Sequence, residues 1–360
     1  MRYLAEFRQG GLVPGLVDAI ARLARPIRIM EVCGGHTHAI CRYGLAALLP
    51  PEVHLVHGPG CPVCIVPTAT VANAVALTDR PEVVVACFGD IMRVPSPRGT
   101  LLSRARGTGR VHMVYSPLEA LDLARVSPDR QVVFLAIGFE TTAPSTAMVL
   151  RRAWKDAVSN FTVMSAHYLV PPALRALMRH PATRVDAFIA PGHVSAVIGL
   201  RAYDFLCADH GCPVVVSGFE PLDILHSVLM ILEQFQRGEA TVGNQYRRAV
   251  RYSGNETAMA AVSEVFAVAD ADWRGLGRIA ASGLMPAPDY GAWDAAQRYP
   301  APQSDAEDSA ECRCGDVLRG IISPADCALF AAACTPENPF GPCMVSTEGT
   351  CAAYYRYRDV

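Results

Sequence analysis

The chain has 360 residues, 51% of them hydrophobic and 18% charged, and its 32 Lys plus Arg nearly balance 34 Asp plus Glu. This composition is typical of a globular protein of two or three domains and excludes wholesale disorder. A net charge of -2 excludes the basic excess that holds phosphate backbones, so we expect no nucleic-acid partner.

Short runs rich in β-forming residues recur along the first two thirds of the chain. They lie at 27–32, 53–57, 83–88, 111–115, 132–137, 161–166, 187–190 and 214–216. Segments of helical periodicity lie between most of these runs, for example at 143–158 and 221–236. The alternation predicts an α/β fold in which parallel sheets are covered by helices on both faces.

The spacing of these elements predicts the domain organisation. We expect two α/β domains of four strands each, over residues 1–117 and 118–254, with a single barrel as the alternative. From residue 255 onward the pattern changes to helical and irregular chain, and 300–311 has the polar, acidic character of a linker. A third domain, mostly helical or irregular, is therefore expected over residues 255–360.

Thirteen cysteines stand out in this composition. The first ten residues lack the apolar core of a secretory signal, and the longest uncharged stretch, 53–78, contains prolines and histidines that do not suit a membrane span. We therefore expect a cytoplasmic protein with no membrane partner. In that compartment an odd number of cysteines indicates metal ligation or redox chemistry rather than a disulfide framework.

Polar and glycine-rich sequences follow almost every predicted strand, where the carboxyl ends of parallel strands form a ligand-binding crevice. The first of them is Cys33-Gly-Gly-His-Thr-His38. We expect Cys33 to be an exposed thiolate whose pKa is depressed by the amides of a following helix, with a buried small side chain as the alternative. His36 and His38, in the same motif, are candidate catalytic residues.

Cys61 and Cys64 form a Cys-x-x-Cys motif within 58–64, after the second predicted strand. Such a spacing suits either a disulfide or two bonds to a metal. Redox or transient iron chemistry is favoured over structural zinc, because no second Cys-x-x-Cys motif supplies the remaining zinc ligands, although His36, His38 and His57 could complete such a site.

The C-terminal forty residues contain a dense array of sulfur. Its members are Cys312, Cys314, Cys327, Cys334, Cys343 and Cys351. A 4Fe-4S cluster takes four thiolates, and composition does not decide which four of these six would bind it. A structural zinc site is the alternative, although it would leave two sulfurs without a role.

Taken together, these motifs resemble the HypD family of hydrogenase maturation proteins over almost the whole chain. The resemblance rests on residues 30–38, 58–64, 87–90 with Arg93, 138–144, 167–172, 190–194, 218–223, 243–246, 334–337, 341–346 and 348–355. It implies a redox-active assembly scaffold rather than a conventional turnover enzyme. Such a scaffold holds iron while cyanide and CO are added to make the Fe(CN)2CO group of nickel-iron hydrogenase.

The same resemblance implies partners and ligands at the assembly site. Cys33 would bind the iron together with a cysteine of a small HypC-type chaperone, and a HypE-type protein would donate the cyanide. Cys61 and Cys64 would be the thiol pair at this site, in contact with the iron being assembled.

For the C-terminal array, the resemblance implies two separate roles. Cys314 and Cys343 would form a redox pair near a 4Fe-4S cluster. The cluster ligands would be Cys312, Cys327, Cys334 and Cys351. Two other functions stay open: a cluster-dependent thiol-disulfide oxidoreductase, which needs no equivalent of Cys33, and a zinc-binding interaction protein.

Overall fold

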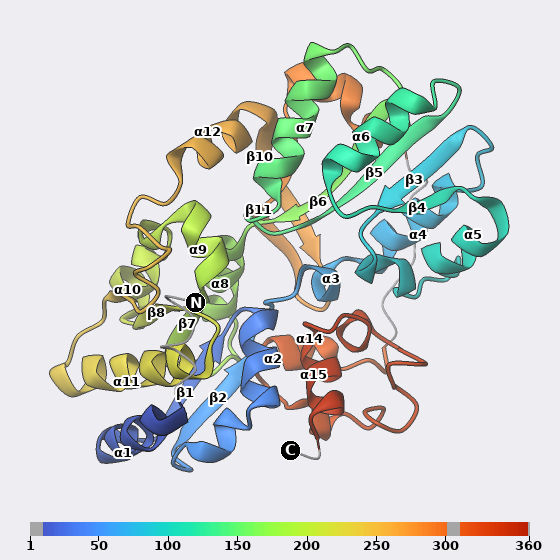
Figure 1. Cartoon of the computed structure of the whole chain (residues 1–360). Coiled ribbons are helices and arrows are strands. Elements are labelled where there is room, and N and C mark those ends of the chain that lie inside the picture. Colours follow the sequence, from blue (N-terminus) through green and yellow to red (C-terminus); the bar gives the residue numbers. More distant parts are fainter. Residues whose placement is uncertain (1–9, 301–309, 359–360) are drawn as a thin grey trace.

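The computed structural model describes residues 10–300 and 310–358. Within these ranges the strands form two separate open sheets, and helices cover both. In Figure 1 the longer strands of one sheet lie at the top, the other sheet lies at the lower left, and the cysteine-rich C-terminal segment lies at the lower right.

The first sheet is entirely parallel, with strand order β2-β1-β7-β8-β9. Its strands are β1 (Ile27–Glu31), β2 (Val53–His57), β7 (Ala187–Pro191), β8 (Val214–Ser217) and β9 (Val242–Asn244). Alternate residues face opposite sides of the sheet, so that Ile29 and Ile189 pack in one apolar cluster and Met30 and Ala190 in another. Both faces are therefore buried, as expected for a parallel sheet.

The second sheet has the order β10-β11-β6-β5-β3-β4. Its strands are β3 (Val83–Cys87), β4 (Val111–Met113), β5 (Gln131–Gly138), β6 (Phe161–Tyr168), β10 (Phe266–Trp273) and β11 (Gly277–Pro286). Strands β4, β3, β5 and β6 are parallel, whereas the hairpin β10-β11 adds to β6 in antiparallel fashion.

The helices occupy the connections between strands and the C-terminal segment. They are α1 (Val13–Leu23), α2 (Gly34–Arg42), α3 (Pro62–Ile65), α4 (Thr68–Leu77), α5 (Leu101–Thr108), α6 (Pro117–Val126), α7 (Ala143–Lys155), α8 (Val170–Arg179), α9 (Gly192–Ile198), α10 (Asp204–His210), α11 (Pro221–Arg237), α12 (Glu256–Val265), α13 (Ala295–Arg298), α14 (Cys314–Leu318) and α15 (Thr350–Arg356). Several begin at a proline, whose fixed φ suits the first turn.

The predicted α/β class and all eight predicted strands are confirmed, and two open sheets replace the alternative of a single barrel. The expected allocation of strands is wrong, however, because β1 and β2 belong to one sheet and β3 to β6 belong to the other. The chain then returns to the first sheet for β7 to β9. Long helical crossovers let parallel strands pair across any sequence distance, so sequence order does not reveal which strands are neighbours.

The third predicted domain also needs a correction. Residues 266–286 form the hairpin β10-β11 rather than helical or irregular chain, and this hairpin extends the second sheet. Alanine and aspartate alternate along β10, and this composition gives a weak strand signal. The expected linker falls partly at 301–309, outside the described residues.

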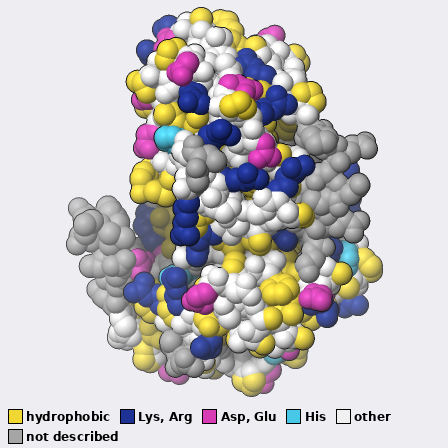
Figure 2. Space-filling view, turned by 90° about the vertical axis from the view of Figure 1, so that its right-hand side faces the viewer, with side chains coloured by type: hydrophobic (Ala, Val, Ile, Leu, Met, Phe, Trp, Pro, Cys, Tyr) yellow, Lys and Arg dark blue, Asp and Glu magenta, His cyan; other side chains and the backbone are white. Residues whose placement is uncertain are grey.

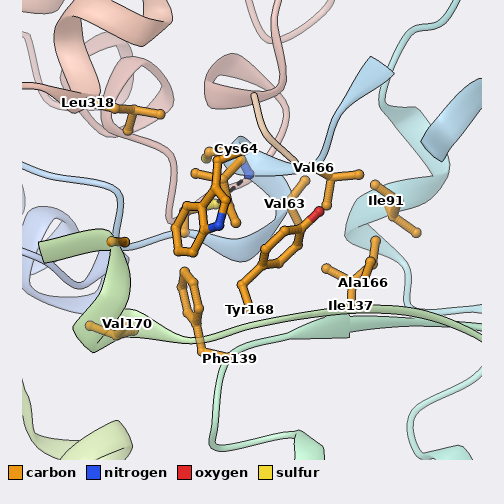
Figure 3. Packing of buried hydrophobic residues seen from close by; sticks show 14 of the residues in the cluster. Val63, Cys64, Val66, Ile91, Ile137, Phe139, Ala166, Tyr168, Val170 and Leu318 are labelled. Carbon is orange, nitrogen blue, oxygen red and sulfur yellow. Dashed lines mark hydrogen bonds between the residues drawn. The ribbon is translucent and has the colours of Figure 1, made fainter. Parts of the chain in front are cut away.

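A large apolar core joins the second sheet to the C-terminal segment. Figure 3 shows Cys64 and Val63 of α3 between Ile137, Phe139 and Tyr168 from the second sheet on one side and Leu318 of α14 on the other. Each large apolar side chain buried in this way contributes about 1.5–3 kcal/mol to folding. This packing fixes the Cys-x-x-Cys motif at the meeting point of the three parts of the molecule.

Figure 2 shows a face of the molecule on which arginine side chains gather near mid-height, with acidic side chains among them. The surface is hollowed there, between the upper and lower halves of the view. Across residues 10–300 and 310–358, every helix is too short or too polar to cross a membrane.

Candidate functional site

Cys33 lies at the exit of β1 and caps the N-terminus of α2. The backbone N–H groups of Gly35 and His36 lie near its thiol, but the thiol makes no capping hydrogen bond to the helix. The side chain is only 2% exposed, so the prediction of an exposed thiolate is wrong. Burial and the nearby Glu31 carboxylate raise the pKa of Cys33 well above its usual value, and the helix amides oppose this shift without overcoming it.

Two glycines let other parts of the chain approach Cys33 closely. A Cβ atom on Gly60 would lie 2.2 Å from the backbone nitrogen of Cys33, and a Cβ on Gly34 would lie 2.5 Å from the carbonyl oxygen of Glu348. Only glycine fits at such distances. The loop that carries Cys33 is therefore held between the Cys-x-x-Cys loop and the C-terminal segment.

The two candidate histidines of the first motif point in different directions. The Nε2 atom of His36 donates to the carbonyl oxygen of Gly218 at 2.9 Å, and the ring stacks on Phe219. His38 instead lies 3.1 Å from the hydroxyl of Tyr357, because residues two apart on a helix face opposite sides.

The imidazole in contact with Cys33 belongs to His193, which was not among the predicted catalytic residues. Its Nδ1 atom lies 3.7 Å from the Cys33 thiol. Burial and the nearby His36 lower the pKa of His193 to about 4, so the ring is neutral at neutral pH. The signal was the sequence Ala190-Pro-Gly-His193 at the exit of a strand, but only the pairing of β7 with β1 places it beside Cys33.

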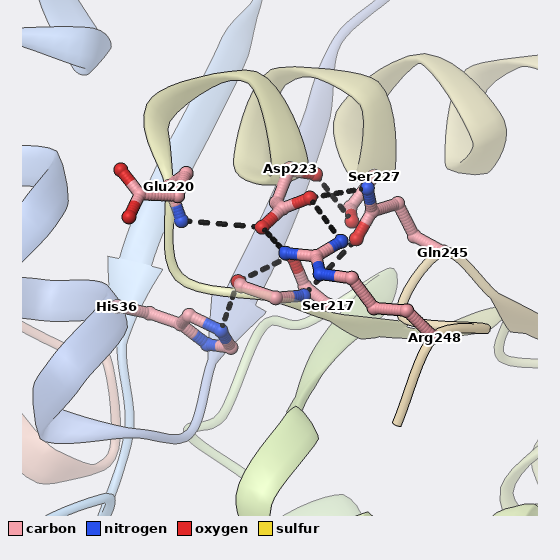
Figure 4. A network of polar contacts seen from close by, with 8 residues as sticks. His36, Ser217, Glu220, Asp223, Ser227, Gln245 and Arg248 are labelled. Atoms are coloured by element: carbon pink, nitrogen blue, oxygen red, sulfur yellow. Dashed lines mark hydrogen bonds and ion pairs between the residues drawn. The ribbon is translucent and has the colours of Figure 1, made fainter. Parts of the chain in front are cut away.

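A polar network around the buried Asp223 holds the loop that contacts His36. Figure 4 shows Arg248 and Gln245 converging on the carboxylate of Asp223. Gln245 also accepts a hydrogen bond from the backbone N–H of Gly218 at 3.0 Å, and the carbonyl of Gly218 is the acceptor for His36. Asp223 is completely buried, so its charge needs these partners. The network thus fixes the loop against which His36 packs.

A cavity of about 340 Å³ opens between the strand exits of the two sheets. Gly60, Asp90 and Thr142 line it, together with His193 and Glu348. Burial, followed by the nearby Asp90 carboxylate, raises the pKa of Glu348. Cys33 does not line this cavity itself, but His193, which does, contacts the Cys33 thiol, so the cavity lies next to Cys33.

Glu140, at the exit of β5, is a buried carboxyl group in the same region. One oxygen accepts the backbone N–H of Val170 at 2.9 Å, and the other oxygen has no partner among the described residues. Burial raises the pKa of Glu140 to about 7.

We expect this group to make folding stability depend on pH. Its folded pKa is above the unfolded value, so its stabilising effect is full below about pH 4.5 and is lost as the pH rises through about 7. In the wild type the free energy of unfolding should therefore fall by about 3 kcal/mol over this range, and Glu140→Gln should abolish this decrease. Urea unfolding at pH 5 and pH 8 checks this, with the exposed Glu52→Gln as control; a parallel pH dependence in wild type and Glu140→Gln would refute it.

Cys61 and Cys64 lie at the start of α3, where the thiol of Cys61 accepts the backbone N–H of Cys64 at 3.3 Å. Burial raises the pKa of Cys64, whose thiol also contacts the thiols of Cys343 and Cys61. The motif is therefore joined to the C-terminal array directly, through sulfur.

All six cysteines of the C-terminal array line one cavity. The cavity wall is completed by apolar side chains such as Leu329, Phe330 and Met344. A Cβ on Gly341 would lie 2.6 Å from the Cys312 sulfur, which explains the glycine in this wall. The thiol of Cys334 accepts backbone N–H groups of Phe340 and Gly341, and hydrogen bonds of this kind tune cluster sulfurs.

The thiols of this array contact one another in a continuous series. Cys314 contacts Cys312 and Cys343, while Cys343 also contacts Cys351 and Cys64. Among residues 10–300 and 310–358, no three His, Cys, Asp or Glu side chains are arranged to hold a single metal ion. The wall of the cavity nevertheless offers six soft sulfur donors and no carboxylate or imidazole, the donor set of an iron-sulfur cluster.

Comparison with known proteins agrees with this arrangement. The family described as "HypD: Hydrogenase formation hypA family" matches residues 12–358. The chain is 47% identical to the hydrogenase maturation factor HypD of Rhodobacter capsulatus over 99% of this chain and 98% of that protein. It is also 47% identical to that of Escherichia coli over 100% and 99%, and 45% identical to that of Azotobacter vinelandii over 99% and 97%.

These matches identify the chain as a hydrogenase maturation factor, and in its structure two sheets and a cysteine-rich segment meet around buried thiols. The chain belongs to the HypD family.

Proposed function

We propose that this protein is a cytoplasmic iron-sulfur scaffold on which the Fe(CN)2CO group of nickel-iron hydrogenase is built. One observation carries the proposal: the six-cysteine cavity is connected by sulfur contacts to Cys61 and Cys64, and the loop that carries this pair packs on the backbone of Cys33, whose thiol contacts His193. This arrangement provides one place for electrons, at the cysteine array, and another for the iron cargo, at Cys33.

At the second place, Cys33 supplies a soft thiolate ligand of the kind that suits an iron carrying cyanide and CO. One thiolate leaves the coordination of the iron incomplete, so we propose that a small HypC-type chaperone supplies a second. The cavity of about 340 Å³ between the strand exits is lined by His193, which contacts Cys33, and we propose that such a partner and a HypE-type cyanide donor approach Cys33 from there.

At the place for electrons, the cysteine array, the residues suit two-electron chemistry. Cleaving a protein thiocyanate to a thiolate and cyanide consumes two electrons, and two thiolates release two electrons when they form a disulfide. Cys314 and Cys343 are in contact, as are Cys64 and Cys61, so each pair is placed to make this exchange. A 4Fe-4S cluster bound by Cys312, Cys327, Cys334 and Cys351 would supply electrons to them one at a time.

A cluster-dependent thiol-disulfide oxidoreductase would need the sulfur contacts but not the arrangement around Cys33. Cys33 and its helix are contacted by several parts of the chain. Two glycines allow close backbone packing, the neutral imidazole of His193 contacts the thiol, and a polar network holds the loop on which His36 packs. Because these features surround a single thiol that an oxidoreductase would not need, they support the scaffold function over the oxidoreductase function.

Metal analysis of anaerobically purified protein tests the proposal. We expect about four iron and about four sulfide ions per chain, because the thiol-lined cavity provides a complete ligand set for a 4Fe-4S cluster. Stoichiometric zinc without sulfide would contradict it, and would favour a zinc-binding interaction protein instead.

A further inference from the structure

Helix α15 joins the thiol-lined cavity to the Cys33 loop. Cys351, one of the cavity cysteines, lies in its first turn. The helix packs along α2, whose N-cap is Cys33, and the two helices lie close together in Figure 1. The segment just before α15 also rests on Gly34, as the short distance from Gly34 to Glu348 shows.

Two tyrosine hydroxyls fasten α15 to the first sheet and to α2. The hydroxyl of Tyr354 lies 3.1 Å from Nε2 of His57, at the end of β2. The hydroxyl of Tyr357 lies 3.1 Å from Nε2 of His38, on α2. Burial raises the pKa of Tyr354, so its hydroxyl stays protonated and donates to the imidazole.

The contact of Tyr354 continues inward as far as the backbone of Cys33. Nδ1 of His57 lies 2.6 Å from Oε1 of Glu31, and the hydroxyl of Thr37 donates to the same oxygen. The second oxygen of Glu31 accepts the backbone N–H of Cys33 at 2.9 Å. Glu31 is completely buried, so its carboxylate depends on all three donors and cannot turn toward water if one is lost.

We propose that Tyr354 is a positioning residue through which the cysteine-bearing helix α15 holds the Cys33 loop, by way of His57 and Glu31. The position of Cys351 in the six-cysteine cavity and the position of the Cys33 loop are thereby coupled. The Cys33 thiol stays buried only when α15 is in place. The inference rests on the proposed function in one respect, that an iron-sulfur cluster is the group that orders the cavity.

The accessibility of Cys33 measures this coupling. In the anaerobically purified full chain, the rate of Cys33 alkylation by iodoacetamide is followed by mass spectrometry of the peptide containing it. Tyr354→Phe removes one hydroxyl from the series and should raise this rate about tenfold, the effect of losing one buried hydrogen bond. Tyr355→Phe is the matched control, since the Tyr355 ring packs against Phe330 and its hydroxyl has no partner among residues 10–300 and 310–358.

Cys212 serves as an internal reference, because it is 2% exposed like Cys33 but lies beside Asp186, at the end of the first sheet where its strands begin, whereas Cys33 lies where β1 ends. Its alkylation rate should be the same in all three proteins. A rate at Cys33 that is equal in Tyr354→Phe and Tyr355→Phe would overturn the proposal. A rise of equal size at Cys212 would also overturn it, since this would indicate general loosening.

Removal of the cluster with a chelator provides the second measurement. It should raise the Cys33 rate in the wild type, and should add less than a further twofold in Tyr354→Phe, where the connection is already broken. Equal increases in both proteins would overturn the coupling. If the wild type binds no iron or sulfide, the proposed function fails, whereas the comparison of the two tyrosine variants still decides the role of Tyr354.

Discussion

Replacing Cys334 with alanine is expected to abolish the 4Fe-4S cluster. The Cys334 thiol lines the sulfur-rich cavity and accepts the backbone N–H of Phe340 at 3.4 Å, a hydrogen bond of the kind made to ligating sulfurs. Its loss leaves one iron without a protein thiolate and opens the cluster to solvent. Visible absorption of the anaerobic protein and its iron and sulfide content measure the loss.

Cys314→Ala is the control for this experiment. Cys314 lines the same cavity and contacts Cys312 and Cys343, but we assign it to the redox pair and not to the cluster. The cluster should therefore survive in Cys314→Ala. Retention of full absorption in Cys334→Ala, or its disappearance in Cys314→Ala, would mean that the ligands are a different four of the six cysteines.

The second large effect is expected for Cys33→Ala. This variant should keep the 4Fe-4S cluster and lose the infrared bands of iron-bound cyanide and CO in the complex with a HypC-type chaperone. An outside reductant can replace a redox pair, but nothing replaces a missing ligand of the iron. Cys33→Ser should retain at most a trace of these bands, because an alkoxide is a harder ligand.

Cys41→Ala is the matched control, since Cys41 is on the same helix as Cys33. The infrared bands of iron-bound cyanide and CO in Cys41→Ala should match those of the wild type. Normal cyanide and CO bands in Cys33→Ala would show that Cys33 is structural, and would shift the iron site toward Cys61 and Cys64.

The sequence was sufficient to predict strands β1 to β8 and the motifs that follow them, but not β9 or the hairpin β10-β11. Runs such as 83–88 and 132–137 are rich in β-branched residues. The polar residues that follow these strands line the cavity of about 340 Å³ between the two sheets. The place of Cys33 after β1 and before α2 was likewise predicted correctly. These features are local, because a strand and its exit are adjacent in the chain.

Features that depend on distant parts of the chain were not predictable in the same way. Cys33 is buried because Gly60 and the segment around Glu348 pack on its loop, and neither is a sequence neighbour. His193 reaches Cys33 only because β7 pairs with β1. The pKa of Cys33 is raised chiefly by this burial, which the pattern of its own motif does not reveal.

The alternation of the chain between two sheets also governs how the protein can form during synthesis. When β1 and β2 leave the ribosome, β1 has only one of its two neighbours, and a pair of strands is marginally stable by itself. Its open edge must wait for β7, about 130 residues later, and such distant pairing is slow. A nascent chain with a long-lived open edge is prone to pair wrongly with other chains until β7 covers that edge.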